Sequence, residues 1–572
     1  MRQTLHIALL SNCTTEYIAI AMKEEYSNNQ LASEILNMPY NQYNAEISDP
    51  NSNLYRFNPE IIFFCLEGRL LFEEWYRSPV LKSSEELKTS VIQETFESLK
   101  TTLETVLTNS KATIIFNNFP VPYYSPLGIL DNKAKPGLKD MISILNSKLE
   151  EWARDRERLY IFDYHGLCSQ YGYDRAKDER MYYLTMSPVS IPFARVLARE
   201  YLRYVLPIKN KNRKCLVLDL DNTLWGGIAG EDGLSGITLD ISGAGRSFYD
   251  FQQELINLYE KGVILAINSK NNLKDAMEII EDHPHMLLKK NFFAVMKINW
   301  KDKSENMLEI ARELNIGLDS LVFFDDNPVE RELITKLLPQ VKVVNVPKDT
   351  SKYVDTLRKL ADFEVLNLTE DDRKRNEMYL ANKRRDEEEH LFHSKEDFLA
   401  SLQSKLILET ANQFNLPRIA QLIGKTNQFN MTTHRYPQDH VKSMSVSADH
   451  MVFCASVTDK FGDNGIVGVC LIKLSGDIAQ IDTFLLSCRV LSRNIEYCFL
   501  SSILAILQSK GIKKVFAYYI ETPKNEANKH FYPSAGFQKL SQEGSKTVYL
   551  MSEPFTLKSF DYVEIQIESG GK

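Results

Sequence analysis

Short apolar runs recur along the first two thirds of the chain, separated by amphipathic stretches long enough to form helices. One block of this kind has runs at 6–10, 61–65, 112–116 and 159–163. A second block has runs at 215–220, 263–267, 292–295, 321–324 and 341–346. Such runs between helical lengths are typical of parallel strands buried on both faces. The sequence therefore predicts two α/β domains, 1–206 and 207–368, joined near Pro207.

The last third of the chain has a different pattern. A mixed-charge segment at 369–398, with opposite charges three and four positions apart, predicts an exposed linker helix. Beyond it, a helical stretch at 496–509 and a run at 515–519 follow apolar runs at 405–410, 451–456, 466–474 and 478–486. Consecutive strands before a helix and a strand are typical of an α+β domain, here 399–572.

Composition limits the class of function. The 572 residues are 44% hydrophobic and 25% charged, as in most folded soluble proteins. The net charge of −8 leaves no basic excess for a polyphosphate backbone, so we expect no nucleic-acid partner. No apolar run approaches the ~20 residues of a membrane span, and the N-terminus lacks a signal-peptide core, which indicates a cytoplasmic protein. The eight cysteines form no C-x-x-C pair and are expected to be reduced.

Asp219 and Asp221 stand two positions apart at the end of the run 215–220, before a glycine-rich turn. On a strand this spacing places both carboxylates on the same side, where their repulsion calls for a cation such as Mg²⁺. One carboxylate can attack phosphorus and form an aspartyl phosphate, while the other protonates the leaving oxygen and then activates water. The pair predicts metal-assisted phosphoryl transfer, with Thr223 as a phosphate ligand.

Three later strand ends supply the rest of this chemistry. Ser269 offers a hydroxyl to a phosphoryl oxygen, and Lys303 offers a fixed positive charge. Asp325 and Asp326 follow the run 321–324 and are expected to complete the metal site. Because open α/β sheets bind ligands at the carboxyl ends of their strands, we expect these groups to converge.

These four motifs, in this order, resemble the haloacid dehalogenase (HAD) superfamily of aspartyl phosphotransferases, which implies a Rossmann-like parallel-sheet core. Fifty positions separate Asp219 from Ser269 and thirty-four separate Ser269 from Lys303, lengths that the core itself uses. No separate cap domain fits between them. A macromolecule or another domain of the chain must therefore cover the site.

Longer strings, at 219–233, 269–271, 325–332, 425–433 and 461–468, resemble the FkbH-like subgroup of HAD proteins. The resemblance implies loading of a glyceryl unit from 1,3-bisphosphoglycerate onto the phosphopantetheine thiol of an acyl carrier protein in polyketide-type biosynthesis. It also implies removal of the remaining phosphate by Asp219, Asp221, Ser269, Lys303 and Asp326.

Glyceryl-transferring members carry an acceptor cysteine where this chain has Asn268. Cys215 cannot replace it, because four strand residues place it ~13 Å from Asp219, and it is expected to be a buried core residue. The carrier thiol could attack the acyl phosphate directly. Alternatively, the protein is a phosphatase for another phosphorylated small molecule or carrier-bound intermediate, without acyl transfer. An interaction scaffold with vestigial sites is disfavoured by the complete motif set.

Several residues beside the motifs are candidates for docking a carrier or substrate. They are Trp225, Asn268, Asn327, Cys488 and Arg489. The basic stretch Lys209–Lys214 is a further candidate for contact with an acidic carrier protein.

The flanking domains resemble two other families. The first domain resembles SGNH hydrolases, with Ser11, Asn118, Asp163 and His165 at strand ends. Leu9-Leu10 replaces the usual Gly-Asp, and the acid and imidazole are two rather than three positions apart, which indicates a noncatalytic binding scaffold.

The last domain resembles GNAT acyltransferases over 522–528 and 531–537. Its pyrophosphate-binding turn has Ser492 and Asn494 in place of both glycines. Glycines at those positions let backbone N–H groups approach phosphates at a helix start. Their replacement indicates a structural or carrier-docking role rather than coenzyme A binding.

Overall fold

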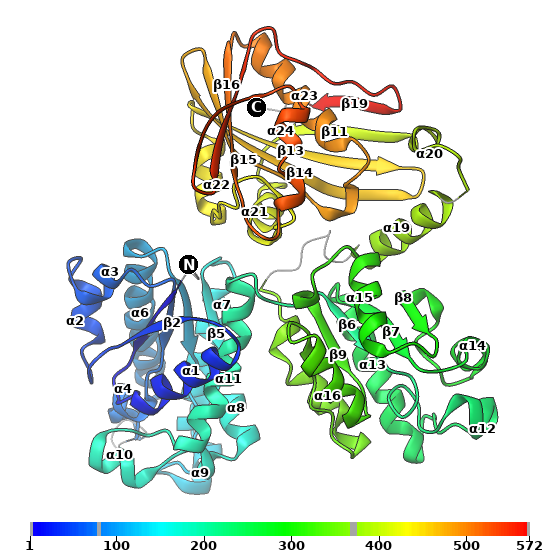
Figure 1. The fold of residues 1–572 in the computed structure, drawn as a ribbon. Helices are drawn as coiled ribbons and strands as arrows, with labels where there is room; N and C mark the ends of the chain where they lie inside the picture. Colours follow the sequence, from blue (N-terminus) through cyan, green and yellow to red (C-terminus); the bar gives the residue numbers. More distant parts are fainter. Residues whose placement is uncertain (1–3, 77–81, 367–374, 390, 569–572) are drawn as a thin grey trace. The chain divides into compact units, whose positions relative to one another are not determined.

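The computed structural model describes residues 4–76, 82–366, 375–389 and 391–568 (Figure 1). The chain divides into two compact units, Met1–Ile208 and Lys209–Lys572, close to the expected joint at Pro207. The second expected joint, between 368 and 369, lies outside the described residues. No helix in the described part of the chain is long and apolar enough to cross a membrane.

The first unit is built on a parallel sheet with strand order β2-β1-β3-β4-β5. Four of these strands are the predicted apolar runs. The fifth, β2, lies at the sheet edge and is only partly buried, so it carries no continuous apolar run. The strands are β1 (Leu5–Leu10), β2 (Ser33–Asn37), β3 (Ile61–Phe64), β4 (Thr113–Asn117) and β5 (Leu159–Phe162).

Helices cover both faces of this sheet (Figure 1). On one face α1 (Glu16–Asn28) packs beside α11 (Ile191–Ile208), whose Tyr201 stacks on Phe63 of β3 with ring centroids 4.3 Å apart. The other face packs against α6 (Glu85–Asn109) and α7 (Leu138–Ala153). Shorter helices complete the unit: α2 (Tyr43–Ser48), α3 (Asn53–Phe57), α4 (Gly68–Leu71), α8 (Tyr164–Tyr171), α9 (Tyr173–Ala176) and α10 (Glu179–Thr185).

The second unit begins with another parallel sheet, of order β10-β9-β6-β7-β8. Its strands are β6 (Cys215–Leu218), β7 (Ile264–Ser269), β8 (Phe293–Ile298), β9 (Leu321–Phe324) and β10 (Lys342–Val343). The run 341–346 contributes only two strand residues, and β6 ends two residues before the predicted 220. The early end of β6 matters for the site, because Asp219 and Asp221 then lie in a turn.

Two apolar layers enclose this sheet. One contains α13 (Arg246–Glu260), α14 (Leu273–Asp282) and α17 (Tyr353–Arg358), and the other contains α15 (Lys303–Glu313) and α16 (Pro328–Leu337). The connections from β6 to β7 and from β7 to β8, described throughout, contain only α12 (Ala229–Gly236), α13, α14 and short 3-10 turns. This part of the chain therefore has no inserted cap domain, as its spacing predicts.

The C-terminal part holds a mixed sheet of nine strands, ordered β17-β18-β16-β15-β14-β13-β11-β19, with β12 paired to β15. The pairs β15–β16 and β11–β19 are parallel and the others antiparallel. Its strands are β11 (Ser404–Thr410), β12 (Phe429–Asn430), β13 (His450–Asp459), β14 (Gly462–Ser475), β15 (Ile478–Leu486), β16 (Lys514–Ile520), β17 (Gln538–Glu543), β18 (Lys546–Ser552) and β19 (Val563–Glu568).

Helices also cover both faces of the mixed sheet (Figure 1). One face packs against α23 (Ile495–Ser509) and α24 (Phe531–Ser534), and the other against α21 (Leu416–Lys425) and α22 (Gln438–Ser445). The predicted strands and the helix at 496–509 are present. The strands β12, β17, β18 and β19 are missing from the prediction. Strand β12 has only two residues and β17 and β19 are mostly exposed, whereas β18 contains an apolar run that the prediction overlooked.

The linker helix is less exposed than predicted. Within the segment 369–398, the structure describes α19 (Arg375–Glu389) and α20 (Lys395–Ser401). The Arg385 side chain is 2% exposed and forms an ion pair with Asp459 of β13, with Nη2 2.6 Å from Oδ1. Since a charged side chain is buried only with a partner, α19 is part of the fold rather than a solvated connector.

Candidate active site

The groups predicted for phosphoryl transfer gather where the strand order of the second unit reverses. From β6 the chain moves outward through β7 and β8 and then returns to β9, on the other side of β6. Ligands bind at such switch points in open α/β sheets. Asp219 follows β6 and Asp325 follows β9, and the Asp219 N–H donates to the Phe324 carbonyl at 3.1 Å.

Lys303 lies between two buried carboxylates. Its Nζ is 2.6 Å from Asp325 Oδ2 and 3.0 Å from Asp219 Oδ2. The Lys303 side chain is 3% exposed and that of Asp325 is fully buried. With Asp326, which is half-buried, Asp219 and Asp325 form a group whose ligand oxygens lie within 4.8 Å of one another.

The protonation of this group is set by burial and by the closeness of its negative charges. Burial raises the pKa of Asp325 to about 7 and that of Asp326 to about 6, and the negative charge of Asp219 adds to both shifts. Burial also disfavours the charge on Lys303, but the attraction of Asp219 and Asp325 outweighs it and raises the pKa of the ammonium group. The positive charge of one ammonium group therefore does not balance the negative charges of three carboxylates.

Two buried oxygens at the site have no hydrogen-bond partner. They are Asp219 Oδ1 and Thr223 Oγ1. A buried polar atom without a partner carries a free-energy cost that a bound group removes. Carboxylate oxygens at this density fit a hard divalent cation, and Thr223 is placed in the same turn as Asp219. The residues present therefore fit a cation beside a phosphoryl group.

Asp221 lies outside the carboxylate trio, contrary to the prediction that it shares the metal. Because β6 ends at Leu218, the chain has already turned, and the two carboxylates no longer share a strand face. Asp221 Oδ1 accepts hydrogen bonds from Trp225 Nε1 and the Ala229 N–H, both at 3.0 Å. Burial raises the pKa of Asp221, which favours its protonated form. This environment suits a proton donor.

Asn271 was missed among the candidates although it belongs to the string 269–271. Its Nδ2 donates to Asp221 Oδ2 at 2.9 Å and so fixes the second oxygen of that carboxylate. Arg331, in the string 325–332, was missed as well. It donates to the carbonyls of Asp325 and Asp326, both at 2.7 Å, and holds the loop after β9.

Of three docking candidates, Trp225 and Asn268 are fully buried, whereas Asn327 is exposed. Trp225 is fully buried, with its indole committed to Asp221. Asn327 caps α16 by accepting from the Val329 N–H at 2.9 Å. Asn268 is fully buried at the end of β7, beside Ser269, which is also buried. Cys215 is buried as expected, and burial raises the pKa of its thiol.

Arg213 also departs from its predicted role in a basic docking patch. Its Nε is 3.1 Å from Asp362 Oδ1, and its Nη1 donates to the backbone carbonyls of Asp319, Leu321 and Gln340. These bonds join segments distant in the sequence. The side chain is therefore committed to the fold.

The comparisons with known proteins point to one family. Residues 6–205 match the family described as FkbH, N-terminal domain. The solved structure of the N-terminal part of BF1531 from Bacteroides fragilis, containing a phosphatase domain complexed with Mg, is 30% identical to the chain. That match has a TM-score of 0.58 and covers 64% of this chain and 95% of the other. The chain belongs to the FkbH-like HAD phosphatase family.

Other solved structures match part of this FkbH-like phosphatase. The PaiA N-acetyltransferase of Thermoplasma acidophilum, in complex with coenzyme A, is 20% identical, with a TM-score of 0.18 over 20% of this chain and 72% of that one. The ribosomal-protein-S18-alanine N-acetyltransferase of Escherichia coli is 12% identical, with a TM-score of 0.21, and the match covers 27% of this chain and 97% of that one. None of the curated proteins matches the chain.

The N-terminal unit of the FkbH-like phosphatase does not assemble the predicted hydrolase arrangement. Ser11 is fully buried and its hydroxyl donates to the Cys65 carbonyl at 2.7 Å. His165 Nδ1 accepts from the Val121 N–H at 3.1 Å, and Asp163 caps α8. Asn118 Nδ2 donates to Asp163 Oδ1 at 3.1 Å. Each group thus has a hydrogen-bond partner within the unit, and its noncatalytic role stays a prediction.

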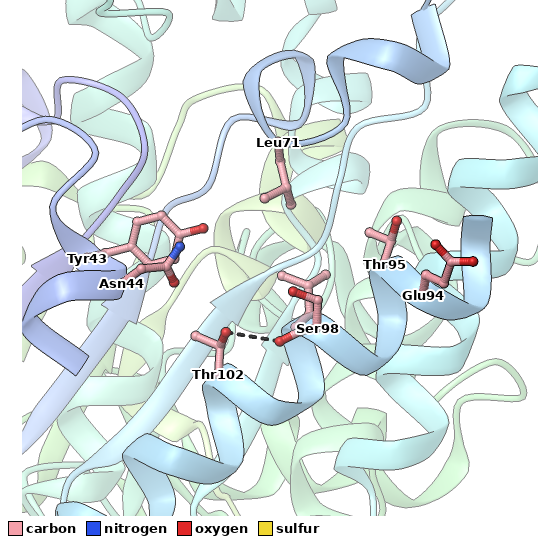
Figure 2. A pocket seen from close by; sticks show the side chains of 8 residues that line it. Tyr43, Asn44, Leu71, Glu94, Thr95, Ser98 and Thr102 are labelled. Atoms are coloured by element: carbon pink, nitrogen blue, oxygen red, sulfur yellow. Dashed lines mark hydrogen bonds between the residues drawn. The ribbon is translucent and has the colours of Figure 1, made fainter. Parts of the chain in front are cut away.

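A groove of about 280 Å³ lies elsewhere on this unit, between α2, α4 and α6 (Figure 2). It is lined by Tyr43, Asn44, Leu71, Glu94, Thr95, Ser98, Leu99 and Thr102. The Thr95 and Thr102 hydroxyls donate to carbonyls of their own helix, and Glu94 accepts from the Ser90 hydroxyl. The groove is polar, and the hydrogen bonds of Glu94, Thr95 and Thr102 are made with α6 itself.

In the C-terminal part of the FkbH-like phosphatase, the candidate Arg489 is buried, with Nε 3.1 Å from Ser487 Oγ. The side chain of Cys488 lies outside the described residues. Ser492 and Asn494, which replace the expected glycines, both have positive φ, at 66° and 62°. The turn before α23 thus keeps a glycine-type backbone although it has side chains there.

Proposed function

We propose that this FkbH-like phosphatase hydrolyses a phosphate ester through an aspartyl phosphate on Asp219. The position of Lys303 between the buried carboxylates of Asp219 and Asp325, at the switch point of the sheet, carries this proposal. An ammonium group there offers positive charge to the transferring phosphoryl group. Ser269 and Thr223 are the hydroxyl ligands proposed for that group.

The residues divide the reaction into two steps. Asp219 attacks phosphorus as the ester P–O bond breaks, and Asp221 gives its proton to the leaving oxygen. Asp221, now ionised, takes a proton from water, whose oxygen attacks phosphorus while the bond to Asp219 breaks. Inorganic phosphate leaves and Asp219 is regenerated. The raised pKa of Asp221 supports its role as the acid.

Asp219, Asp325 and Asp326 would hold Mg²⁺, as the phosphatase domain of BF1531 is complexed with Mg. When bound, the ion supplies positive charge that neutralises the carboxylates and the phosphoryl oxygens. The ammonium group of Lys303 is held by two carboxylates of the protein itself. Oxygen Oδ1 of Asp219 is the ligand atom that the protein leaves without a partner.

The substrate we favour is a phosphorylated acyl unit on an acyl carrier protein, loaded from 1,3-bisphosphoglycerate. The carrier thiol attacks the acyl carbon, the C–O bond to phosphate breaks, and the thiol proton passes to the released phosphate. Hydrolysis of the remaining phosphate ester at Asp219 then leaves a glyceryl thioester. The seven cysteines whose side chains are described are all buried, which supports a thiol supplied by the partner.

Apolar side chains at the rim of the site support a macromolecular partner. Ile228, Leu273, Trp300 and Val329 are all exposed, Trp300 and Val329 by 70% each, and each follows a different strand of the sheet. The Trp300 indole donates to Asn272 Oδ1 at 3.0 Å, which ties two of these loops together. An uncapped site bordered by apolar groups is suited to closure by a bound protein.

A second candidate is a phosphatase for another phosphorylated small molecule or carrier-bound intermediate, without acyl transfer. The amide of Asn268, buried where other members carry a thiol, favours this candidate. A carboxamide cannot form a covalent thioester. With a carrier-bound intermediate as substrate, the enzyme would act after another protein has attached the acyl group.

The two candidates are separated by incubating holo acyl carrier protein with 1,3-bisphosphoglycerate, Mg²⁺ and enzyme, followed by intact mass measurement of the carrier. A glyceryl adduct supports transfer with dephosphorylation, and Asp219→Asn should convert it to a phosphoglyceryl adduct. Phosphate release without a carrier adduct supports the second candidate. Phosphate release that is unchanged in Asp219→Asn would overturn the role of Asp219 in both.

A further inference from the structure

A cluster of three asparagine side chains lies behind Lys303. Asn268 is the last residue but one of β7, Asn299 follows β8, and Asn306 lies on the first turn of α15. Asn268 and Asn306 are both fully buried. We propose that Asn268 is a positioning residue, which sets the place of the Lys303 ammonium group through the backbone of α15. The proposal rests on phosphate-ester hydrolysis at this site and is independent of the natural substrate.

The hydrogen bonds of Asn268 point directly at the start of α15. Its Nδ2 donates to the backbone carbonyl of Lys303 at 2.8 Å. Its Oδ1 accepts from Asn306 Nδ2 at 3.1 Å. Asn306 and Asn299 exchange two further hydrogen bonds, at 3.1 and 3.2 Å. One carboxamide thus holds two positions of the helix, three residues apart, against the end of β7.

Lys303 is the first residue of α15, so its placement depends on what anchors the helix start. The backbone at a helix terminus lacks part of the hydrogen bonding that fixes the helix interior. A donor from β7 supplies an additional anchor at the residue whose side chain reaches into the site. The same strand provides Ser269, so Asn268 couples the positions of a phosphate ligand and of the ammonium group.

The contacts of Lys303 show how accurately its ammonium group must be placed. Its Nζ lies 2.6 Å from Asp325 and 3.0 Å from Asp219, so a small rotation of the helix start alters both contacts. Displacements of about 1 Å at a reacting centre cost about 100-fold in rate. Changes to groups that support a ligand shell cost about 10- to 100-fold in activity. We expect Asn268 variants to fall within this range.

This position also explains why Asn268 does not contact substrate. The side chain is fully buried and both of its polar atoms are engaged. A buried carboxamide is costly unless it is hydrogen bonded, and here the bonds are made with the protein itself. Its effect on the reaction therefore passes through Lys303.

The kinetic test uses the full chain, Mg²⁺ and p-nitrophenyl phosphate. Asn268→Asp keeps the acceptor for Asn306 but removes the donor to Lys303, and Asn268→Ala removes both. We expect kcat to fall by about 10- to 100-fold in each variant, with KM changed by less than about threefold. The double variant Asn268→Ala/Asn306→Ala should lose less activity than the sum of the losses in the two single variants, because the two side chains share one hydrogen bond.

A matched control is Asn146→Ala in the N-terminal unit. Asn146 is also a buried carboxamide, bonded to the Phe119 N–H at 2.9 Å and to the Phe119 carbonyl at 2.8 Å. The control should lower the thermal midpoint and leave kcat unchanged. If Asn268→Ala lowered only the thermal midpoint, as the control does, the positioning role would be wrong.

A crystal structure of Asn268→Asp provides a readout that needs no activity. We expect Lys303 Nζ to lose hydrogen-bonding distance to Asp219 or Asp325. Retention of both contacts would overturn the proposal even if the kinetics changed. A wild-type enzyme inactive toward every phosphate ester would instead refute the proposed function, and the structure of the variant would still decide the role of Asn268.

Discussion

Single residues at the site owe their properties to burial within a few ångströms of one another. Asp219 lies 3.0 Å from Lys303, which contacts Asp325 at 2.6 Å. In water such pairs would contribute little, because solvent screens them. In the buried site the same contacts determine which groups stay charged and which hold protons. Two predictions follow from this arrangement.

Asp219→Asn should abolish phosphate-ester hydrolysis. The amide is nearly the same size as the carboxylate but cannot form the phosphorylated intermediate, so we expect kcat for p-nitrophenyl phosphate to fall by about 10³-fold or more. The thermal midpoint should stay close to that of the wild type. Asp232→Asn, at an exposed carboxylate of α12, is the control and should retain the wild-type kcat.

Mg²⁺ binding should weaken as the pH falls. With pKa values of about 7 for Asp325 and about 6 for Asp326, both carboxyls bind protons as the solution becomes acidic, and protons compete with the cation. Affinity should therefore rise from pH 5.5 to 7.5 by about tenfold or more and then level off. Isothermal titration measures it, and affinity independent of pH would contradict the raised pKa values.

At the scale of elements, α19 and α23 show how helices join the C-terminal sheet. The Arg385 guanidinium of α19 donates to both Asp459 oxygens, at 2.7 and 2.6 Å. Arg493, just before α23, reaches the same carboxylate at 3.2 Å. Asp459 itself is fully buried, so the loss of a partner leaves an incompletely compensated charge.

Arg385→Ala should destabilise the packing of α19 on β13 by about 3 kcal/mol. Hydrogen exchange of β13 amides in the full chain reports this loss as faster exchange. Arg384→Ala is the matched control, because Arg384 is the exposed neighbour on the same helix and its truncation should leave the exchange unchanged. Equal exchange in the two variants would show that the buried ion pair does not hold α19.

Coenzyme A should not bind the turn before α23. Helix starts favour anions, but an acidic residue, Glu496, already occupies the first turn of α23. Residues 429–431 also lie between β15 and β16, where Met431 accepts from the Ile520 N–H at 2.8 Å and donates to the Phe484 carbonyl at 3.0 Å. Titration calorimetry should detect no saturable binding up to about 1 mM coenzyme A. Saturation below that concentration would contradict the prediction.

At the scale of the whole molecule, the proposed chemistry belongs to one of the two compact units. Asp219, Asp221, Ser269, Lys303 and Asp325 all lie in Lys209–Lys572. The first unit has its own apolar core on both faces of its sheet. Units with separate cores are expected to fold independently.

A fragment of residues 209–572 should therefore hydrolyse p-nitrophenyl phosphate with a kcat within about threefold of the full chain. Residues 1–208 alone should give a cooperative thermal transition and no hydrolysis. If the fragment folded, as judged by circular dichroism, but lost activity, the first unit would have to contribute to the chemical step.

The linear pattern of residues determined the two parallel sheets and most of the proposed site. Apolar runs separated by helical lengths are a local property, and parallel topology brings the carboxyl ends of strands to one edge whatever the details of packing. The sequence thus sufficed to place Asp219, Lys303 and Asp325 together, and the role of Ser269 stays a prediction. The edge strands β2 and β19 were not predicted, because a strand at an exposed edge needs no continuous apolar run.

Only the tertiary structure decided which of these groups act together. Because β6 ends at Leu218, the Asp221 carboxylate lies outside the carboxylate trio of Asp219, Asp325 and Asp326. The point at which β6 ends depends on how the following turn packs. Asn268 and Trp225 look available in the sequence but are fully buried and hydrogen bonded to other segments. Partners distant along the chain leave no local signal, since burial and hydrogen bonding arise only when the segments pack. The sequence therefore determined the chemical groups, and packing decided their roles.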